Sequence, residues 1–442
     1  MQHQPNFIQN LRNELADGRL WLDRSIVLAY AIAAGLSVVA FTLLAEWSFA
    51  QFERVFHWQG GWAVLVWTPA WTAAIVWATQ RFTPGAAGSG IPQVMAALEP
   101  ALDNTQRSRF VSLRLTLAKI VLGGAGFLAG LSIGREGPSV QVAAGVMHHA
   151  RRWLGPQSSI TGSGLLIAGG AAGIAAAFNA PLAGVVFAIE ELSRKLESRS
   201  SGLIITAIVL AGLMGVSAFG NRSYFGVIQV GALGWNTLLP GLAVALTCGV
   251  LGGLFAKLMA ASLTHAPERM NRLRARYPVR FATGCGLAIA VIGLVTGGAT
   301  FGAGSDAVKH MLEGHADVPS FYVTLKFIAT WLSAWSGVPG GIFAPSLSIG
   351  AGVGHNVSML VGADYAPALI AMGMAAFLAA VTQAPLTAFI IVMEMVDGHS
   401  MVLSLMASAM LASLISRMLA RPLYETLAQH MVARLNPPPA SP

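Results

Sequence analysis

Apolar stretches long enough to cross a bilayer recur along nearly the whole chain, from Ser25 to Arg417, with no polar domain between them. Charged residues make up only 10% of the chain and hydrophobic residues 55%, whereas a soluble domain carries about 25% charged residues. We therefore expect an all-α integral membrane protein that crosses the bilayer many times. The predicted spans cover residues 25–45, 62–78, 113–131, 162–189, 202–219, 238–263, 281–296, 321–335, 366–393 and 401–415.

The excess of basic residues, a formal net charge of +8, indicates orientation rather than a nucleic-acid partner. Basic side chains fall in short loops between spans, which is typical of the cytoplasmic side of a membrane protein. The residues that mark this side are Arg12, Arg19, Arg24, Arg107, Arg109, Arg194, Lys195, Arg199, residues 269–280, Arg417, Arg421 and Arg434. Both termini are then predicted to be cytoplasmic, with residues 1–24 as an N-terminal segment and residues 425–442 as a short tail. Arg151 and Arg152 do not fit this scheme.

The chain contains an internal repeat. Residues 169–190 align with residues 373–394 at a constant spacing of 204 residues, and an upstream stretch that begins at Gly134 repeats at a spacing of 207 residues. The matched pairs include Pro138 with Pro345, His148 with His355, Pro181 with Pro385 and Glu190 with Glu394. Related halves in a membrane protein commonly form an inverted pair with the substrate site near the midplane, at the ends of broken helices. We therefore expect two inverted-repeat halves of tilted, broken helices, residues 25–220 and 221–424.

Four segments place glycine, proline or a single polar group at a break in an apolar run. They are Gly88-Ser89-Gly90-Ile91-Pro92, Gly134-Arg135-Glu136-Gly137-Pro138, Gly340-Gly341-Ile342-Phe343-Ala344-Pro345, and Tyr424 after Pro422. Glycine lets the backbone turn and approach closely, proline suits the first turn of a helix, and the N–H groups exposed there attract negative charge. Such segments can hold an anion without a full positive charge, which would bind the ion too tightly for conduction.

Taken one at a time, these residues have ordinary explanations. Ser89 alone could be a helix N-cap, Tyr424 alone could be an interfacial aromatic, and Glu136 could form a salt bridge with Arg135. An ionisable group inside a membrane is costly, however, and Glu136 is by that argument a functional candidate.

Together and in this order, the four segments resemble the signature of the CLC family of chloride channels and proton/chloride antiporters, and the resemblance covers most of the chain. The spacing of Glu136 and Glu191 and the segment Arg421-Pro422-Leu423-Tyr424 are similar to those of bacterial members. The resemblance implies a homodimer with one pathway per subunit, in the inner membrane of a bacterium. It also implies that no cytoplasmic regulatory domain is present, because only 18 residues follow Tyr424.

The same resemblance, carried over residue by residue, implies a chloride site. The residues assigned to it are Ser89, Arg135, Gly137, Ile342, Phe343 and Tyr424. The Ser89 and Tyr424 hydroxyls and the backbone N–H groups of Ile342 and Phe343 would donate hydrogen bonds to the ion.

Two glutamates are assigned to gating and proton transfer. The Glu136 carboxylate has the charge of chloride and can accept the same N–H groups, so it can occupy an anion site and leave it on protonation. Glu191 matches the inner proton-transfer glutamate of antiporters, and Glu190, repeated as Glu394, is assigned a structural role. From the residues alone, Glu190 and Glu191 could equally be ordinary charges at a helix end. Lys119 matches a buried family lysine whose positive potential favours the anion.

We therefore predict chloride transport in exchange for protons. Chloride, protons, lipid and a second copy of the chain are the predicted partners, with no cofactor and no metal. A passive chloride channel of the same fold is the main alternative, which Glu191 disfavours because a channel needs no inner proton donor. A fluoride/proton antiporter is disfavoured because fluoride-type relatives depart from the Gly-Ser-Gly-Ile-Pro pattern. An integral membrane enzyme would need a convergent nucleophile, acid/base or metal set, which the apolar segments do not supply, so we expect no enzyme.

Overall fold

The computed structural model describes residues 18–156, 158, 160–193, 201–220, 235–264, 269–314, 319 and 321–435. Over these ranges the chain is helical and forms no β-strand, only two isolated β-bridges. Seven of the described helices are long and apolar enough to cross a membrane. The predicted all-α membrane fold is therefore confirmed. The predicted orientation markers Arg12, Arg194, Lys195 and Arg199, most of the N-terminal segment and the end of the tail lie outside the described residues.

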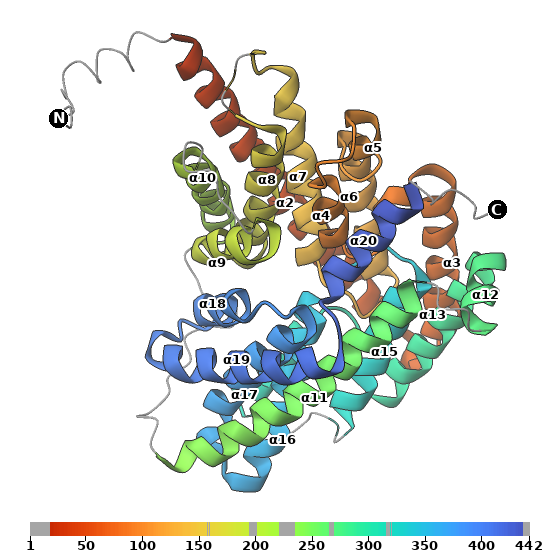
Figure 1. The fold of residues 1–442 in the computed structure, drawn as a ribbon. Helices are drawn as coiled ribbons and strands as arrows, with labels where there is room; N and C mark the ends of the chain where they lie inside the picture. Colours follow the sequence, from red (N-terminus) through yellow and green to blue (C-terminus); the bar gives the residue numbers. More distant parts are fainter. Residues whose placement is uncertain are drawn as a thin grey trace, which may run out of the picture.

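The helices that precede residue 220 include α4 and α7, which begin at two of the four broken segments (Figure 1). In chain order these helices are α2 (Gly18–His57), α3 (Val64–Phe82), α4 (Ile91–Ala97), α5 (Asn104–Ser108), α6 (Leu113–Leu128), α7 (Glu136–His149), α8 (Gly162–Phe178), α9 (Pro181–Phe187) with a following π-helical turn (Ala188–Leu192), and α10 (Ser201–Phe219).

The helices after residue 234 follow a similar order of long, short and divided elements. They are α11 (Leu238–Leu263), α12 (Arg269–Arg276), α13 (Pro278–Val295), α14 (Ser305–Leu312), α15 (Tyr322–Ser336), α16 (Phe343–Val361), α17 (Ala366–Thr382), α18 (Pro385–Met395), α19 (Val402–Leu419) and α20 (Leu423–Leu435).

Two predicted apolar spans, residues 162–189 and 366–393, are each divided into two helices, as the expectation of broken helices requires. The first helix of each pair ends at a residue in the left-handed conformation, Asn179 with φ 55° and Gln383 with φ 61°. An alanine and then a proline follow, and the proline opens the next helix. The two breaks are 204 residues apart, which is the spacing of the sequence repeat.

Small residues allow the closest helix contacts in both parts of the molecule. On α8, a Cβ on Gly173 would lie 2.4 Å from the carbonyl oxygen of Ser139 on α7. On α17, a Cβ on Gly373 would lie 2.2 Å from the carbonyl oxygen of Gly350 on α16. These glycines let α7 and α16 pack with backbones nearly touching their neighbours. Both helices are thereby fixed with their N-termini in the interior.

Glu190 and Glu394 link the helices before residue 220 to those after residue 234. Each carboxylate bonds to the start of a helix in the other group. The Glu190 carboxylate accepts hydrogen bonds from the N–H groups of Leu386 at 3.0 Å and Thr387 at 2.6 Å, at the start of α18. The Glu394 carboxylate accepts from Leu182 at 3.2 Å and Ala183 at 2.7 Å, at the start of α9. Each carboxylate thus caps a broken helix of the other group, and the capped helices α9 and α18 lie next to each other (Figure 1). This agrees with the structural role assigned to Glu190 and Glu394 from the sequence.

Candidate functional site

Three of the four predicted broken segments are joined to one another through their backbones. Gly134 and Gly341 exchange two N–H to carbonyl hydrogen bonds, of 2.7 and 2.8 Å. Gly88 donates to the carbonyl of Val338 at 3.3 Å and accepts from Gly340 at 3.2 Å. Because these bonds lie just before α4, α7 and α16, they hold three helix N-termini around one interior point. The first N–H groups of each helix have no acceptor within their own helix.

Close approach between two of the segments depends on glycine. Gly90 has φ 108°, and a Cβ there would lie 2.6 Å from the carbonyl oxygen of Gly137. A Cβ on Gly137 would lie 2.4 Å from the Ser89 hydroxyl oxygen. The Ser89 side chain therefore rests directly over the first turn of α7, and any larger residue at Gly90 or Gly137 would push it away.

The Ser89 and Tyr424 hydroxyls lie at this point and are close enough to interact with each other. Both oxygens are buried, and neither forms a hydrogen bond of good geometry within the described residues. Ser89 is not the N-cap of α4, a position that Gly90 takes, and Tyr424 is 1% exposed rather than interfacial. The ordinary explanations for these two residues therefore do not hold. Helix α20 carries Tyr424 between the two parts of the molecule (Figure 1).

Ile342 and Phe343 form the start of α16 beside these hydroxyls. Both side chains are buried, and the Phe343 ring centroid lies 5.9 Å from that of Tyr424. Their position at the helix N-terminus leaves their N–H groups at the positive end of a 19-residue helix. The structure therefore brings Ser89, Ile342, Phe343 and Tyr424 together.

Glu136 is fully buried at the first position of α7. Its Oε2 accepts a hydrogen bond from the N–H of Ala344, in the first turn of α16, at 3.4 Å. A carboxylate thus lies where the N-terminus of a facing helix would hold an anion. Arg135 turns the other way, and its guanidinium pairs with Glu46 of α2 at 2.7 Å. Only the backbone of Arg135 therefore lies among the broken segments.

Lys119 of α6 is fully buried behind the segment that carries Ser89. Its ammonium group donates to the carbonyls of Ala86 at 2.8 Å and Gly88 at 2.6 Å. These bonds satisfy carbonyls that the turn leaves without helical partners, and they place a cation one residue from Ser89.

Glu191 lies in the π-helical turn that ends α9. It is near enough to Glu190 and Glu425 to interact electrostatically with both. The Tyr424 hydroxyl lies within electrostatic reach of Glu191 and also of Glu136. The Tyr424 side chain is therefore close to both predicted proton-transfer residues, Glu136 and Glu191.

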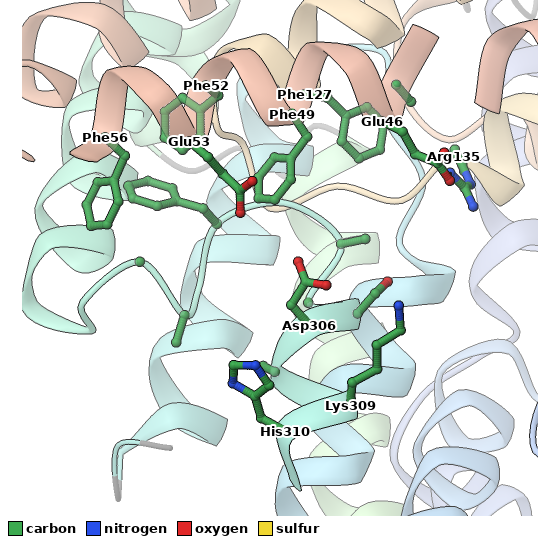
Figure 2. Close-up of a pocket in the computed structure, with 18 of the residues that line it drawn as sticks. Glu46, Phe49, Phe52, Glu53, Phe56, Phe127, Arg135, Asp306, Lys309 and His310 are labelled. Atoms are coloured by element: carbon green, nitrogen blue, oxygen red, sulfur yellow. The ribbon is translucent and has the colours of Figure 1, made fainter. Parts of the chain in front are cut away.

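A cavity of about 620 Å³ reaches the site on the Glu136 side (Figure 2). Charged and aromatic residues of α2 line one wall and charged residues of α14 the other. The labelled lining residues are Glu46, Phe49, Phe52, Glu53, Phe56, Phe127, Arg135, Asp306, Lys309 and His310. Glu53 and Asp306 interact across it. Sequence reasoning missed these cavity residues, since no local pattern relates α2 to α14.

Sequence reasoning also missed Lys326, a second fully buried lysine. It lies on α15 and donates to the carbonyls of Thr300, Phe301 and Gly302. Its position is 207 residues after Lys119, the spacing already visible in the upstream part of the repeat. Extending that alignment would have found it.

The fold and the site together define a multi-pass membrane protein in which the N-termini of broken helices converge on one buried centre. Residues 71–417 match the family model described as voltage gated chloride channel, and the chain belongs to this CLC family.

Relatives of known name include the H(+)/Cl(-) exchange transporter ClcA of Citrobacter koseri, which is 31% identical over 394 residues, covering 84% of this chain and 80% of the relative. The ClcA of Klebsiella pneumoniae is 31% identical over 431 residues, covering 91% of this chain and 87% of the relative.

Solved structures share the fold. A slow cyanobacterial Cl-/H+ antiporter matches with a TM-score of 0.76 and 24% identity, over 95% of this chain and 99% of the other. A CLC-type fluoride/proton antiporter matches with a TM-score of 0.75 and 21% identity, over 92% and 98%.

Proposed function

We propose that this protein is a secondary active transporter that exchanges chloride for protons across a membrane. The observation that carries the proposal is the hydrogen bond from the Ala344 N–H to the buried Glu136 carboxylate, 3.4 Å long. A titratable side chain there competes with an anion for the same donors. The names of the relatives, which describe chloride/proton exchange, support the same choice.

Chloride binding at the centre rests on neutral donors. The Ser89 and Tyr424 hydroxyls and the N–H groups at the start of α16 can each donate to an ion, and Lys119 adds a positive potential from behind the site. Hydrogen bonds from neutral groups offset part of the free-energy cost of dehydrating the ion, without binding it too tightly to leave. An ion held in this way can bind and also leave.

Exchange follows from the competition at Glu136. While ionised, its carboxylate occupies the donors at the start of α16 and blocks an anion from the cavity side. When Glu136 binds a proton it loses its charge, so chloride displaces it and the side chain can swing toward the cavity. Return of the carboxylate releases the proton and expels the anion. One side chain thereby couples the two ion movements.

Glu191 supplies the proton from the opposite end in this proposal. It lies near Tyr424 and Glu425 rather than among the cavity residues. A proton would pass from Glu191 to Glu136 past Tyr424, by a path separate from that of chloride at the inner end. A passive channel would have no need of such a group.

Transport should be tested in liposomes that contain the purified full chain. An outward chloride gradient should drive protons inward against their own gradient, measured with a pH electrode and a chloride electrode in parallel. Chloride movement without proton movement would reject exchange and favour the passive channel. Replacing chloride with fluoride tests the remaining alternative, because a fluoride exchanger should then move protons faster than with chloride.

Two variants assign the roles. Glu191→Ala should abolish proton movement while chloride still flows, and Glu136→Ala should remove both proton coupling and gating. Glu99→Gln is the control, since Glu99 is an exposed glutamate in the loop between α4 and α5. Uncoupled chloride flux in the Glu99 variant would show that any lost carboxylate acts nonspecifically.

The assembly and placement of the protein are proposed on the same basis. We expect a homodimer with one pathway per subunit, joined through apolar faces within residues 173–214 and 376–417, where Leu182, Ile189, Leu213 and Leu414 are exposed in a single chain. We expect the inner membrane of a bacterium, with both termini cytoplasmic. Exchange of this kind needs no cofactor, metal or enzymatic step.

A further inference from the structure

A dense run of arginine stands just before one of the spans. Residues 269–280 contain Arg269, Arg272, Arg274, Arg276 and Arg280, and no acidic residue follows until Asp306. The run forms α12 and the first turn of α13, a span of 18 residues. Its charge is concentrated at the level where the chain enters the membrane.

One face of α12 is fixed to the rest of the protein. The Asn271 side chain is buried, donates to the carbonyl of Ala261 at 3.3 Å and accepts from the Trp335 indole at 3.1 Å. The Arg274 guanidinium donates to the carbonyl of Ser262 at 3.3 Å. Helix α12 is therefore held against α11 and α15 in a defined rotation.

The remaining faces of α12 carry a row of arginines and, beside it, a row of apolar side chains. At 3.6 residues per turn, Arg269, Arg272 and Arg276 lie along one side of the helix, and all three are exposed. Beside them lie Met270, 48% exposed, and Leu273, 45% exposed. A fixed helix with a basic row next to an apolar row has the character of an interfacial helix.

Two arginines of the run lie near the same aromatic ring. The guanidinium carbons of Arg276 and Arg280 each lie 5.3 Å from the centre of the Tyr277 ring. Two like charges at one ring repel each other, and an anion between them removes that repulsion. Tyr277 is 39% exposed, and tyrosine favours the headgroup level of a bilayer.

We propose that α12 and the first turn of α13 bind anionic phospholipid headgroups. Phosphates bind between Arg276 and Arg280 and along the row of Arg269 and Arg272, while Met270 and Leu273 enter the boundary with the acyl chains. Charge complementarity and continuity with the span of α13 select a lipid over a soluble anion, which would leave the apolar row exposed. Juxtamembrane arginines attract anionic lipid, each by about fivefold in affinity.

The test is lipid retention by the full chain purified in a mild detergent. Native mass spectrometry should detect phosphatidylglycerol retained in preference to phosphatidylcholine, and phosphatidylglycerol should raise the temperature of unfolding. The double variant Arg276→Gln/Arg280→Gln should lose at least about tenfold in phosphatidylglycerol affinity. Met270→Ser/Leu273→Ser should also lower retention, because it removes the apolar row without changing the charge.

Arg81→Gln is the matched control. Arg81 is an exposed arginine whose guanidinium carbon lies 5.9 Å from the centre of the Phe82 ring. The Arg81→Gln variant should bind lipid as the unmodified chain does. Arg276→Lys/Arg280→Lys should retain most binding and so separates loss of charge from misfolding. Equal retention of the two lipids, unchanged retention in the Gln double variant, or full stabilisation by inorganic phosphate alone would each overturn the proposal. These readouts do not involve transport, so they are independent of the proposed exchange.

Discussion

The N-termini of α4 and α14 have similar backbones but carry different side chains. Each follows a Gly-X-Gly segment with both glycines in the left-handed region, Gly88 and Gly90 before α4 and Gly302 and Gly304 before α14. Each segment is backed by a buried lysine that donates to its carbonyls. The central residue is Ser89 in the first segment and alanine in the second.

The charge placed at each helix start differs as well. Helix α14 carries its own carboxylate, Asp306, in its first turn, whereas the first turn of α4 contains no acidic residue. An acidic side chain there interacts favourably with the helix dipole and occupies the place of an anion. One scaffold therefore occurs twice, and only the copy with a hydroxyl and no carboxylate of its own suits the exchangeable ion of the proposed function.

The largest expected effect comes from removing the two lysines. Lys119→Met leaves the Ala86 carbonyl without its donor and removes one of the two donors to the Gly88 carbonyl. Lys326→Met removes the donor to the carbonyls of Thr300 and Gly302. Each unpaired buried group costs about 1–3 kcal/mol, so both variants should lower the unfolding temperature in detergent. Only Lys119→Met should also weaken chloride binding, by about tenfold in calorimetry, because a cation near Ser89 is lost. Equal weakening by Lys326→Met would mean that the second copy also serves the ion.

The next effect comes from the second glycine of each segment. Gly90→Ala places a Cβ 2.6 Å from the backbone oxygen of Gly137, so it should destabilise the protein by about 2 kcal/mol or more and abolish measurable chloride binding. Gly304→Ala places a Cβ 2.7 Å from the Cβ of the buried Ser348, at a backbone position with φ 85°. It should also destabilise the protein by about 2 kcal/mol, but it should leave chloride affinity unchanged. Thermal unfolding and chloride titration of the two variants side by side give the comparison.

A third experiment exchanges the central residues. Ser89→Ala removes one donor to the ion and should raise the chloride Kd by about tenfold, since a hydrogen bond to a charged group contributes about 1.5 kcal/mol or more. Ala303→Ser adds a hydroxyl to the matching place, which faces the cavity. It should change the chloride Kd by less than about twofold, because the Asp306 carboxylate already opposes an anion there. Added chloride binding in Ala303→Ser would show that alanine alone had closed the second site.

Much of this site was predictable because it is local in sequence. Glycine, proline and one polar group at each break predict a helix N-terminus, which the structure shows for α4, α7 and α16. The set of four segments also carried the family resemblance. The repeat spacing also predicted that Glu190 and Glu394 share a role, and the structure shows each capping the other part of the molecule.

What the sequence did not predict depends on contacts between distant elements. The pairing of Arg135 with Glu46 joins residues 89 positions apart, and no periodicity relates them. Hydropathy did not locate the breaks within the predicted spans 162–189 and 366–393, because Asn179 and Gln383 are single residues in otherwise apolar runs. Their left-handed backbone conformation comes from local helix capping, which hydropathy does not report. Hydropathy alone therefore identifies a membrane segment but not where its helix divides.

The smallest expected effect concerns Asp306, the built-in carboxylate of the second copy. Asp306→Asn loses a favourable interaction with the α14 dipole but also relieves repulsion with Glu53 across the cavity, so stability should change by less than about 0.5 kcal/mol. Chloride entering from the cavity meets one fewer negative charge, and the chloride flux at low ionic strength should rise by about twofold. The increase should fade as salt is raised to about 0.5 M, because mobile ions screen charges in a water-filled cavity. Glu53→Gln should give the same salt-dependent increase. An increase that persists at high salt would place the effect of Asp306 at the anion site itself, and the two helix starts would then differ less than their charges indicate.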